Sequence, residues 1–211
     1  MTIGRFITLE GIEGAGKSTV AAALSAALKD RGIRVRQTRE PGGTPLAERV
    51  RQLVLTRGEE TVSPTAETLL MFAARAIHLD NLVRPAIARG EWVICDRFTD
   101  ATRAYQGGGR GVDAEWIEGL AASVHAGLEP DLTLLLDLPV SVGLERARAR
   151  RIAAGEAVTD RFESETVQFF ERVRASYLAI AAQDPKRVRI IDASASADLV
   201  RASALDALQG L

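Results

Sequence analysis

The segment from Gly11 to Ser18 carries the residue types needed to bind a chain of phosphates. It reads Gly-Ile-Glu-Gly-Ala-Gly-Lys-Ser and so fits the pattern G-x-x-x-x-G-K-[ST]. An apolar run precedes it and an Ala/Leu-rich stretch follows, which predicts a strand before the loop and a helix after it. Glycines let successive backbone N–H groups turn toward one anion, and a helix N-terminus adds partial positive charge. The pattern therefore predicts a phosphate-binding loop.

The positions within this loop have separate predicted roles. Lys17 is expected to reach the outer phosphates, and the Ser18 hydroxyl is expected to ligate Mg²⁺. The chain has only three lysines, Lys17, Lys29 and Lys186, and one of them occupies the single position that the pattern requires. The other loop positions expected to contact the nucleotide phosphates are Gly11, Ile12, Glu13, Gly14, Ala15, Gly16 and Thr19.

Two further groups of candidate residues lie at the ends of predicted strands. Arg97 could grip a second phosphate through two parallel hydrogen bonds, and Asp96 could hold the magnesium shell through water or orient Arg97. The alternative for this pair is an ordinary surface ion pair. Arg39, Glu40 and Pro41 precede two glycines that permit unusual backbone angles near a ligand, and the alternative there is a plain strand-to-helix turn.

An arginine-rich stretch is a candidate lid. Arg146 and Arg150, and likewise Arg148 and Arg151, have the spacing of neighbours on a helix, and Arg161 follows. Helical character breaks at 153–159, which predicts a short mobile lid whose arginines neutralise charge on a phosphoryl group in transfer. A solvated helix face is the alternative, because this chain uses arginine for nearly every surface cation.

The elements expected to position these residues alternate along the chain. Long helical patterns between short apolar runs imply crossover connections and a parallel sheet. We therefore expect an α/β, three-layer P-loop NTPase fold, with a five-stranded parallel sheet, helices on both faces and ligands at the carboxyl ends of the strands. The predicted strands are 3–9, 34–38, 91–95, 132–137 and 187–191. The predicted helices are 17–30, 45–56, 64–89, 113–126, 139–153, 163–183 and 196–209.

Composition narrows the class of protein. The net charge of −1 over 211 residues gives no electrostatic case for a nucleic-acid partner, and no apolar run could span a membrane. We expect no signal peptide, and the single cysteine, Cys95, is compatible with a cytoplasmic location. His78 and His125 stand far apart, so we expect no zinc site and interpret both as structural or surface residues.

A phosphate loop alone does not identify the reaction. A switch GTPase would carry an Asn-Lys-x-Asp segment, whereas the only asparagine here is Asn81, and a motor ATPase would usually be larger. A small-molecule kinase needs a second anion site and exclusion of water, and both have candidates. A kinase for another acceptor, such as dUMP, UMP or a deoxynucleoside, remains open, as do a nucleotide-binding module without transfer activity and a structural protein with a vestigial loop.

Over nearly its whole length the chain resembles bacterial thymidylate kinases. The resemblance implies transfer of the γ-phosphoryl group of ATP to dTMP, with Mg²⁺, by residues 1–211 as one P-loop kinase domain with a lid insert at about 148–162. It also implies a homodimer that packs through long helices such as 64–89. The segments that carry it are the phosphate loop with Glu10, Thr38–Thr44, Asp96-Arg97-Phe98, Ala104-Tyr105-Gln106-Gly107, Pro130–Thr133 and Asp160-Arg161-Phe162-Glu163.

The same resemblance implies roles for individual residues. Arg97 would hold the dTMP phosphate with Arg51 as a second contact, and Arg75 would bond a thymine carbonyl. The other residues placed near dTMP are Glu40, Thr102, Gln106 and Tyr105, the last crowding the sugar 2′ position.

The lid and the base-stacking position are assigned by the same resemblance. Lid residue Arg150 would reach the phosphates, and Glu13 would hold it. The family stacks an aromatic residue on thymine four positions before the base-reading arginine; here that position is Met71, with Phe72 next to it, so either could cover the base.

Overall fold

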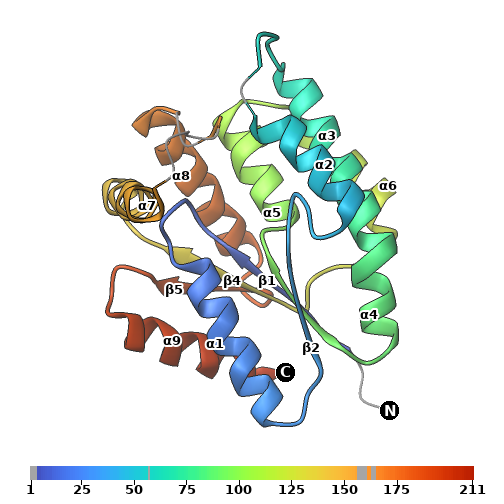
Figure 1. Ribbon diagram of the computed structural model, residues 1–211, viewed down its shortest axis with the longest axis vertical. Coiled ribbons are helices and arrows are strands. Elements are labelled where there is room, and N and C mark those ends of the chain that lie inside the picture. The colour runs from blue at the N-terminus through green and yellow to red at the C-terminus, as the bar shows by residue number, and fades with distance from the viewer. Residues whose placement is uncertain (1–3, 57, 156–160, 163–164) are drawn as a thin grey trace.

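A parallel five-stranded sheet forms the centre of the computed structural model, which describes residues 4–56, 58–155, 161–162 and 165–211 (Figure 1). The strand order is β2-β3-β1-β4-β5, so the first strand lies in the middle and the chain moves outward from it in both directions. The predicted fold class is confirmed, and every predicted strand overlaps an observed one. The strands are β1 (Phe6–Glu10), β2 (Val35–Arg39), β3 (Trp92–Asp96), β4 (Leu132–Asp137) and β5 (Val188–Asp192).

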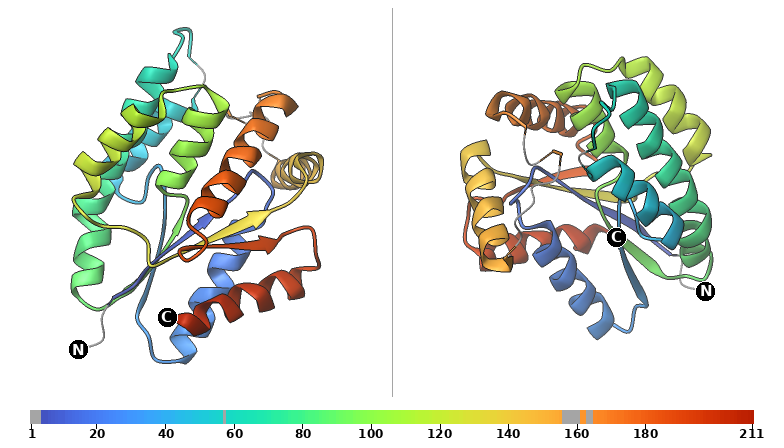
Figure 2. Two further views of the ribbon diagram at one scale, coloured as in Figure 1. Left: turned by 180° about the vertical axis from the view of Figure 1, so that it is seen from behind. Right: turned by 45° about the horizontal axis from the view of Figure 1, so that its top comes forward.

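Helices cover both faces of this sheet, as Figure 2 shows from two further directions. On one face lie α1 and α9, and on the other lie α3 to α6 and α8, while α2 packs against α3 (Figures 1 and 2). The α-helices are α1 (Lys17–Asp30), α2 (Pro45–Leu55), α3 (Pro64–His78), α4 (Arg84–Ala88), α5 (Thr99–Thr102), α6 (Ala114–His125), α7 (Val140–Ala154), α8 (Val167–Gln183) and α9 (Ala197–Asp206). A short 3₁₀ turn, η3 (Ala207–Gly210), follows α9.

Side chains of the central strands alternate between two apolar layers. Phe6, Val93 and Cys95 face the α4 side, where they pack with buried residues of the helical connection, and all three are fully buried. Ile7 and Ile94 belong to the larger core that includes α1. Strands covered on both sides read as continuous apolar runs, which is why the sequence pattern located them well.

The long helix predicted at 64–89 is helical throughout but is not one regular α-helix. A π-helical segment, η1 (Leu79–Val83), joins α3 to α4. Pro85 follows directly; it has no amide hydrogen, and its ring crowds the carbonyl of the residue four positions earlier. Widening of the preceding turn accommodates both effects.

The structure differs from the sequence prediction in the segment at 99–109 and at the start of α8. No helix was predicted at 99–109, but the chain forms α5 and then a π-helical segment, η2 (Arg103–Gly109). The glycines there allow a close approach to α8, because a Cβ at Gly109 would lie 2.5 Å from Phe169. Helix α8 begins at Val167, later than the predicted 163, because the Thr166 side chain caps the amide of Phe169.

None of the helices in the described ranges is long and apolar enough to cross a membrane.

Glycines also let helix α7 approach the loop between β1 and α1. A Cβ at Gly143 would lie 2.6 Å from the carbonyl oxygen of Glu13, and one at Gly14 would lie 2.0 Å from the carbonyl oxygen of Gly143. The loop main chain therefore rests directly on the helix, and neither position has room for a larger residue.

We expect Gly143→Ala to lower the free energy of unfolding by about 1–3 kcal/mol, because the new methyl group must displace the loop or the helix. Gly119→Ala in α6 is the matched control, since a Cβ there meets nothing within 4 Å. It should raise the same free energy by about 0.5–1 kcal/mol through helix propensity. Urea unfolding measures both, and a Gly143→Ala protein as stable as the control would contradict the close approach.

Candidate active site

The loop between β1 and α1 adopts the backbone conformation that its glycines allow. Gly11, Gly14 and Gly16 have φ angles of 132°, 74° and 90°, values that other residues rarely adopt. Gly16 is the N-cap of α1, so the free amides at the start of the helix face the loop. Ala15 and Ile12 are buried beneath it. This is the cradle that the sequence predicted.

Lys17 lies inside this loop with only 8% of its surface exposed. Its Nζ atom donates hydrogen bonds to the carbonyl oxygens of Gly11 and Ile12, both at 3.0 Å. Burial lowers the pKa of its ammonium group to about 8, with the Arg97 charge acting in the same direction and nearby carboxylates opposing both. Ser18 and Thr19 are exposed at the start of α1, on the side open to a ligand.

The pairing of β1 with β3 places the second predicted anion site beside this loop. Leu9 is in register with Asp96, and the amide of Arg97 donates to the carbonyl oxygen of Leu9 at 2.9 Å. Arg97 has a φ angle of 71°, in the left-handed region that non-glycine residues rarely enter. The chain thus turns sharply at the end of β3, and the Arg97 side chain faces the phosphate loop.

Three polar groups hold the guanidinium of Arg97. The side chain of Arg97 is 17% exposed. Its Nη2 atom donates to Glu13 Oε1 and to the Tyr105 hydroxyl, each at 3.0 Å, and Nη1 donates to the Tyr177 hydroxyl at 3.1 Å. Its Cζ atom also lies 4.7 Å from the centre of the Tyr105 ring. The structure therefore pairs Glu13 with Arg97, whereas the sequence had suggested a lid arginine as its partner.

Behind Arg97 lies a buried carboxylate that the sequence analysis did not assign to the site. Glu10, the last residue of β1, accepts hydrogen bonds from the Tyr177 hydroxyl at 2.8 Å and from the Phe98 amide at 2.7 Å. Burial, reinforced by the charge of Asp100, raises the pKa of Glu10 to about 7. Its position next to the loop glycine in the motif was the only sequence signal for it.

One pocket lies between the phosphate loop, β3, α2 and α3. Of the residues predicted to contact dTMP, all but Phe72 line it; Glu13 lines it as well. Its lining also includes Pro41, Leu55, Phe98, Ala101 and Phe162, which were not assigned to the site from the sequence. The predicted residues in its wall are Glu40, Arg51, Met71, Arg75, Arg97, Thr102, Tyr105 and Gln106.

Arg75 forms the inner end of this pocket. Its Nε atom donates to Glu40 Oε2 at 2.7 Å, and its Nη2 atom donates to the carbonyl oxygen of Phe98 and to the Thr102 hydroxyl. Its Nη1 atom is buried and has no hydrogen-bond partner among the described residues. A buried donor without a partner is costly, so the pocket offers this N–H group to a ligand acceptor.

The two candidates for covering a base occupy different positions. Met71 lines the pocket and is half-buried. Phe72 is buried, and the guanidinium of Arg75 lies over its ring with Cζ 4.7 Å from the ring centre. Phe72 is not among the described residues of the pocket wall, and its ring supports Arg75.

Gln106, in η2, is held from behind by a buried carboxylate. Its Nε2 atom donates to Glu67 Oε1 at 2.6 Å, and Glu67 is fully buried in α3. Arg161 Nη2 lies 2.6 Å from the other oxygen of Glu67, and Arg161 Nε donates to the carbonyl oxygen of Val54. The amide oxygen of Gln106 is therefore the end of this side chain left to turn toward a ligand.

The predicted lid arginines Arg146 and Arg150 lie in different surroundings in the structure. Helix α7 extends through Ala154, and Arg150 lies exposed on it, outside the described lining of the pocket. Arg146 instead donates to the carbonyl oxygen of Ala193 at 2.7 Å, on the loop after β5. A second cavity lies there, lined by Gly16, Thr19, Arg146, Ala193 and Arg201 among others. Residues 156–160 of the predicted lid lie outside the described residues.

Both residues of the predicted magnesium site carry oxygen donors. The Ser18 hydroxyl is exposed at the start of α1, and the half-buried Asp96 carboxylate ends β3, where its charge partly opposes the lowering of the Lys17 pKa. Hard oxygen ligands with room for water are what Mg²⁺ prefers, so this donor set fits the ion.

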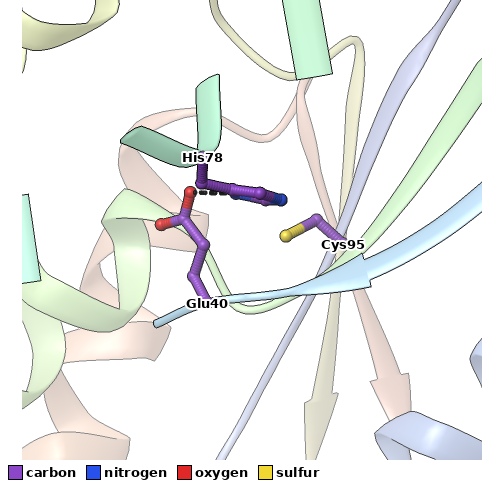
Figure 3. Close-up of side chains that lie close together, drawn as sticks. All are labelled: Glu40, His78 and Cys95. Carbon is purple, nitrogen blue, oxygen red and sulfur yellow. Dashed lines mark hydrogen bonds and ion pairs between the residues drawn. The ribbon is translucent and has the colours of Figure 1, made fainter. Parts of the chain in front are cut away.

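A second group of possible metal ligands does not fit an ion. In Glu40, His78 and Cys95, shown in Figure 3, the ligand atoms lie within 4.8 Å of one another. Both ring nitrogens of His78 and both oxygens of Glu40 already form hydrogen bonds. Burial, with the charge of Glu40 next, raises the pKa of the Cys95 thiol well above its usual value, which disfavours the thiolate that binds metals.

The fold and this loop define a P-loop nucleotide-binding protein. A family model described as thymidylate kinase matches residues 9–204. Thymidylate kinases of Chromohalobacter salexigens and Teredinibacter turnerae are 58% and 57% identical, over 96% and 90% of this chain and 94% and 90% of their own lengths. The crystal structure of thymidylate kinase from Ehrlichia chaffeensis superposes with a TM-score of 0.77 at 32% identity, covering 98% of this chain and 99% of that one. The chain belongs to the thymidylate kinase family.

The lowered pKa of Lys17 predicts how ATP binding changes with pH. The lysine loses its charge as the pH rises through about 8, so binding of an anionic phosphate above that pH requires proton uptake. We expect the Kd for ATP to rise by up to about tenfold per pH unit between pH 8 and 9.5. Calorimetry in two buffers of different ionisation enthalpy measures the Kd and the proton uptake together. Lys17→Arg is the control, because its guanidinium stays charged, and a Kd for the wild type that is constant to pH 9.5 would contradict the prediction.

Proposed function

We propose that this protein transfers the γ-phosphoryl group of ATP to dTMP, giving dTDP and ADP in dTTP biosynthesis. The observation that carries the proposal is the pocket between two arginines, with Arg97 facing the phosphate loop and Arg75 presenting an unpartnered N–H group at the inner end. A nucleoside monophosphate has an anion at one end and base acceptors at the other. Membership of the family supports the same reaction.

The donor nucleotide is proposed to bind the loop from Gly11 to Thr19. Its phosphates lie against the loop amides and Lys17, and its adenine lies in the cavity beside Arg146 and Ala193. Mg²⁺, held by the Ser18 hydroxyl and through water by Asp96, would neutralise charge on the β- and γ-phosphates when bound.

The acceptor is proposed to lie in the pocket with its phosphate toward Arg97 and Arg51. Arg75 bonds a thymine carbonyl through Nη1, and Thr102 and Gln106 lie at the base edge. Met71 is the better-placed side chain to cover the ring, because it lines the pocket. Tyr105, fixed by its hydroxyl to Glu13 at 2.8 Å, crowds the sugar 2′ position and so favours deoxyribose, while Glu40 closes the pocket floor.

Catalysis in this arrangement consists of positioning and electrostatic stabilisation. The attacking phosphate oxygen is already anionic, so no strong general base is needed. Lys17 and Arg97 provide positive charge on either side of the transferring group, and Arg150 would add more from a lid at about 148–162. Arg150 would have to move toward the pocket for this role, because it lies exposed on α7. Glu13 holds Arg97 in the structure, and a lid arginine is a second partner proposed for the closed state.

We further propose that the protein works as a homodimer in the cytoplasm. Three large apolar side chains, Leu46, Leu53 and Leu69, are 46%, 64% and 47% exposed on the neighbouring helices α2 and α3. Apolar side chains gathered on adjacent helices favour a protein interface. The buried, unpaired thiol of Cys95 is compatible with a reducing compartment.

A coupled ADP-release assay with ATP, Mg²⁺ and a panel of dTMP, dUMP, UMP, dCMP and dGMP tests the function. We expect dTMP to be the preferred acceptor, and Lys17→Ala to lower kcat/KM for it by on the order of a thousandfold. Preference for another acceptor would leave the kinase fold and overturn dTMP as the substrate. Activity with none of the five would leave only a nucleotide-binding protein.

A further inference from the structure

The imidazole of His78 is held at both nitrogens beside the acceptor pocket. His78 ends α3 and is completely buried. Its Nδ1 atom lies 2.9 Å from Glu40 Oε1, and its Nε2 atom lies 2.7 Å from the hydroxyl of Thr38 on β2. Figure 3 shows the dashed hydrogen bond from the Glu40 carboxylate to the His78 ring, with the Cys95 sulfur near the other end of the ring. The ring therefore links β2 to the pocket floor.

The chemistry of the neighbours decides where the ring proton lies. Burial acts to raise the pKa of Glu40, but the charge of Arg75 and the hydrogen bond from His78 outweigh it, so this pKa lies below its usual range. An ionised carboxylate only accepts hydrogen bonds, so Nδ1 carries the proton and donates it to Glu40. The Thr38 hydroxyl can then donate to Nε2, and this pair of hydrogen bonds selects the tautomer with the proton on Nδ1.

Glu40 connects His78 to Arg75, because each carboxylate oxygen forms a hydrogen bond with one of the two side chains. The oxygen that does not bond His78, Oε2, accepts from Arg75 Nε at 2.7 Å, with both side chains only 3% exposed. A carboxylate bonded on one side alone could rotate about its last torsion, which is broad for glutamate. The bond from His78 removes that freedom and so holds the carboxylate oxygen that orients the Arg75 guanidinium in the pocket wall.

We propose that His78 is a positioning residue for the acceptor: through its Nδ1–H bond to Glu40 it fixes the orientation of Arg75 and so sets the affinity for the base of the acceptor. His78 itself lies outside the described lining of the pocket and touches no substrate. The inference rests on the proposed function for its kinetic consequence, whereas the tautomer on which it depends is a property of the free protein.

Two substitutions of similar shape distinguish loss of the Nδ1–H hydrogen bond from loss of side-chain volume. His78→Asn keeps an amide donor near the position of Nδ1, and His78→Leu has nearly the same shape without any donor. We expect His78→Leu to raise the KM for dTMP by roughly tenfold or more while kcat and the KM for ATP change by less than about threefold. His78→Asn should recover most of the affinity. Equal kinetics for the two variants, or a loss confined to kcat, would overturn the inference.

His125 provides a matched control. Its Nε2 atom bonds the Thr99 hydroxyl at 2.7 Å and its Nδ1 atom bonds Glu129 at 3.2 Å, so it has the same kind of partners. Its ring stacks on that of Phe98, which lines the pocket, and neither of these two hydrogen bonds reaches Glu40 or Arg75. His125→Leu should therefore lower thermal stability and leave the KM for dTMP within about twofold of the wild-type value. A tenfold rise in that KM would show that loss of any buried histidine has the same effect, and would overturn the inference.

A measurement on the free protein separates this inference from the proposed function. The chain has only two histidines, so a long-range ¹H–¹⁵N spectrum of untagged protein contains two imidazole systems, and His125→Leu assigns them. A protonated Nδ1 in His78 at neutral pH supports the inference even if dTMP proves to be the wrong acceptor. An unprotonated Nδ1 overturns it even if dTMP is phosphorylated.

Discussion

The rest of the site depends on one buried cation, the guanidinium of Arg97. A charge removed from water is costly unless it is paired and hydrogen-bonded. Here Glu13 supplies the opposite charge, and the hydroxyls of Tyr105 and Tyr177 accept two further hydrogen bonds. Glu10 lies directly behind, bonded to Tyr177. The cation is thereby fixed in direction and stays positive, which is what an anion site between two nucleotides requires.

The hydrogen-bond partners of the Arg97 guanidinium come from distant segments, and these segments must pack together around it. The pairing of β1 with β3 brings the phosphate loop and Arg97 to the same edge of the sheet, and the left-handed turn at Arg97 aims the side chain back at the loop. Tyr105 comes from η2 and Tyr177 from α8, so these two segments have to pack closely. Glycines at 108 and 109 make that approach possible, since a Cβ at either would lie about 2.5 Å from α8 atoms. The close packing of η2 against α8 is therefore what brings the two tyrosine hydroxyls to the Arg97 guanidinium.

The sequence predicted the parts of this arrangement that local pattern encodes. Continuous apolar runs located β1, β3 and β4, and the pattern from Gly11 to Ser18 predicted the loop between β1 and α1. The resemblance to the family named the residues that now line one pocket, Arg75 and Gln106 among them. The strand predictions are confirmed, because each rests on a short segment whose residue types are constrained together, whereas the roles of the site residues stay predictions.

Contacts between distant segments could not be predicted in the same way. Tyr177 lies 80 residues after Arg97, and helical spacing marks it only as one more apolar position of α8. His78 was interpreted as a structural or surface residue, because nothing in the sequence shows that Thr38 and Glu40 flank its ring. The segment at 99–109 was left without a helix, since glycine-rich stretches are poor helix formers until α8 packs against them. Burial and partner identity are properties of the assembled fold.

The most direct test of this account compares dTMP with thymidine, which lacks the phosphate, by calorimetry on wild-type protein and on Arg97→Met. The wild type should bind dTMP roughly 10- to 100-fold more tightly than thymidine, as expected for charge-assisted hydrogen bonds to the phosphate. In Arg97→Met this ratio should fall close to one while thymidine binding changes little. A variant that keeps the full preference for dTMP would show that the acceptor phosphate is held elsewhere and would contradict the account.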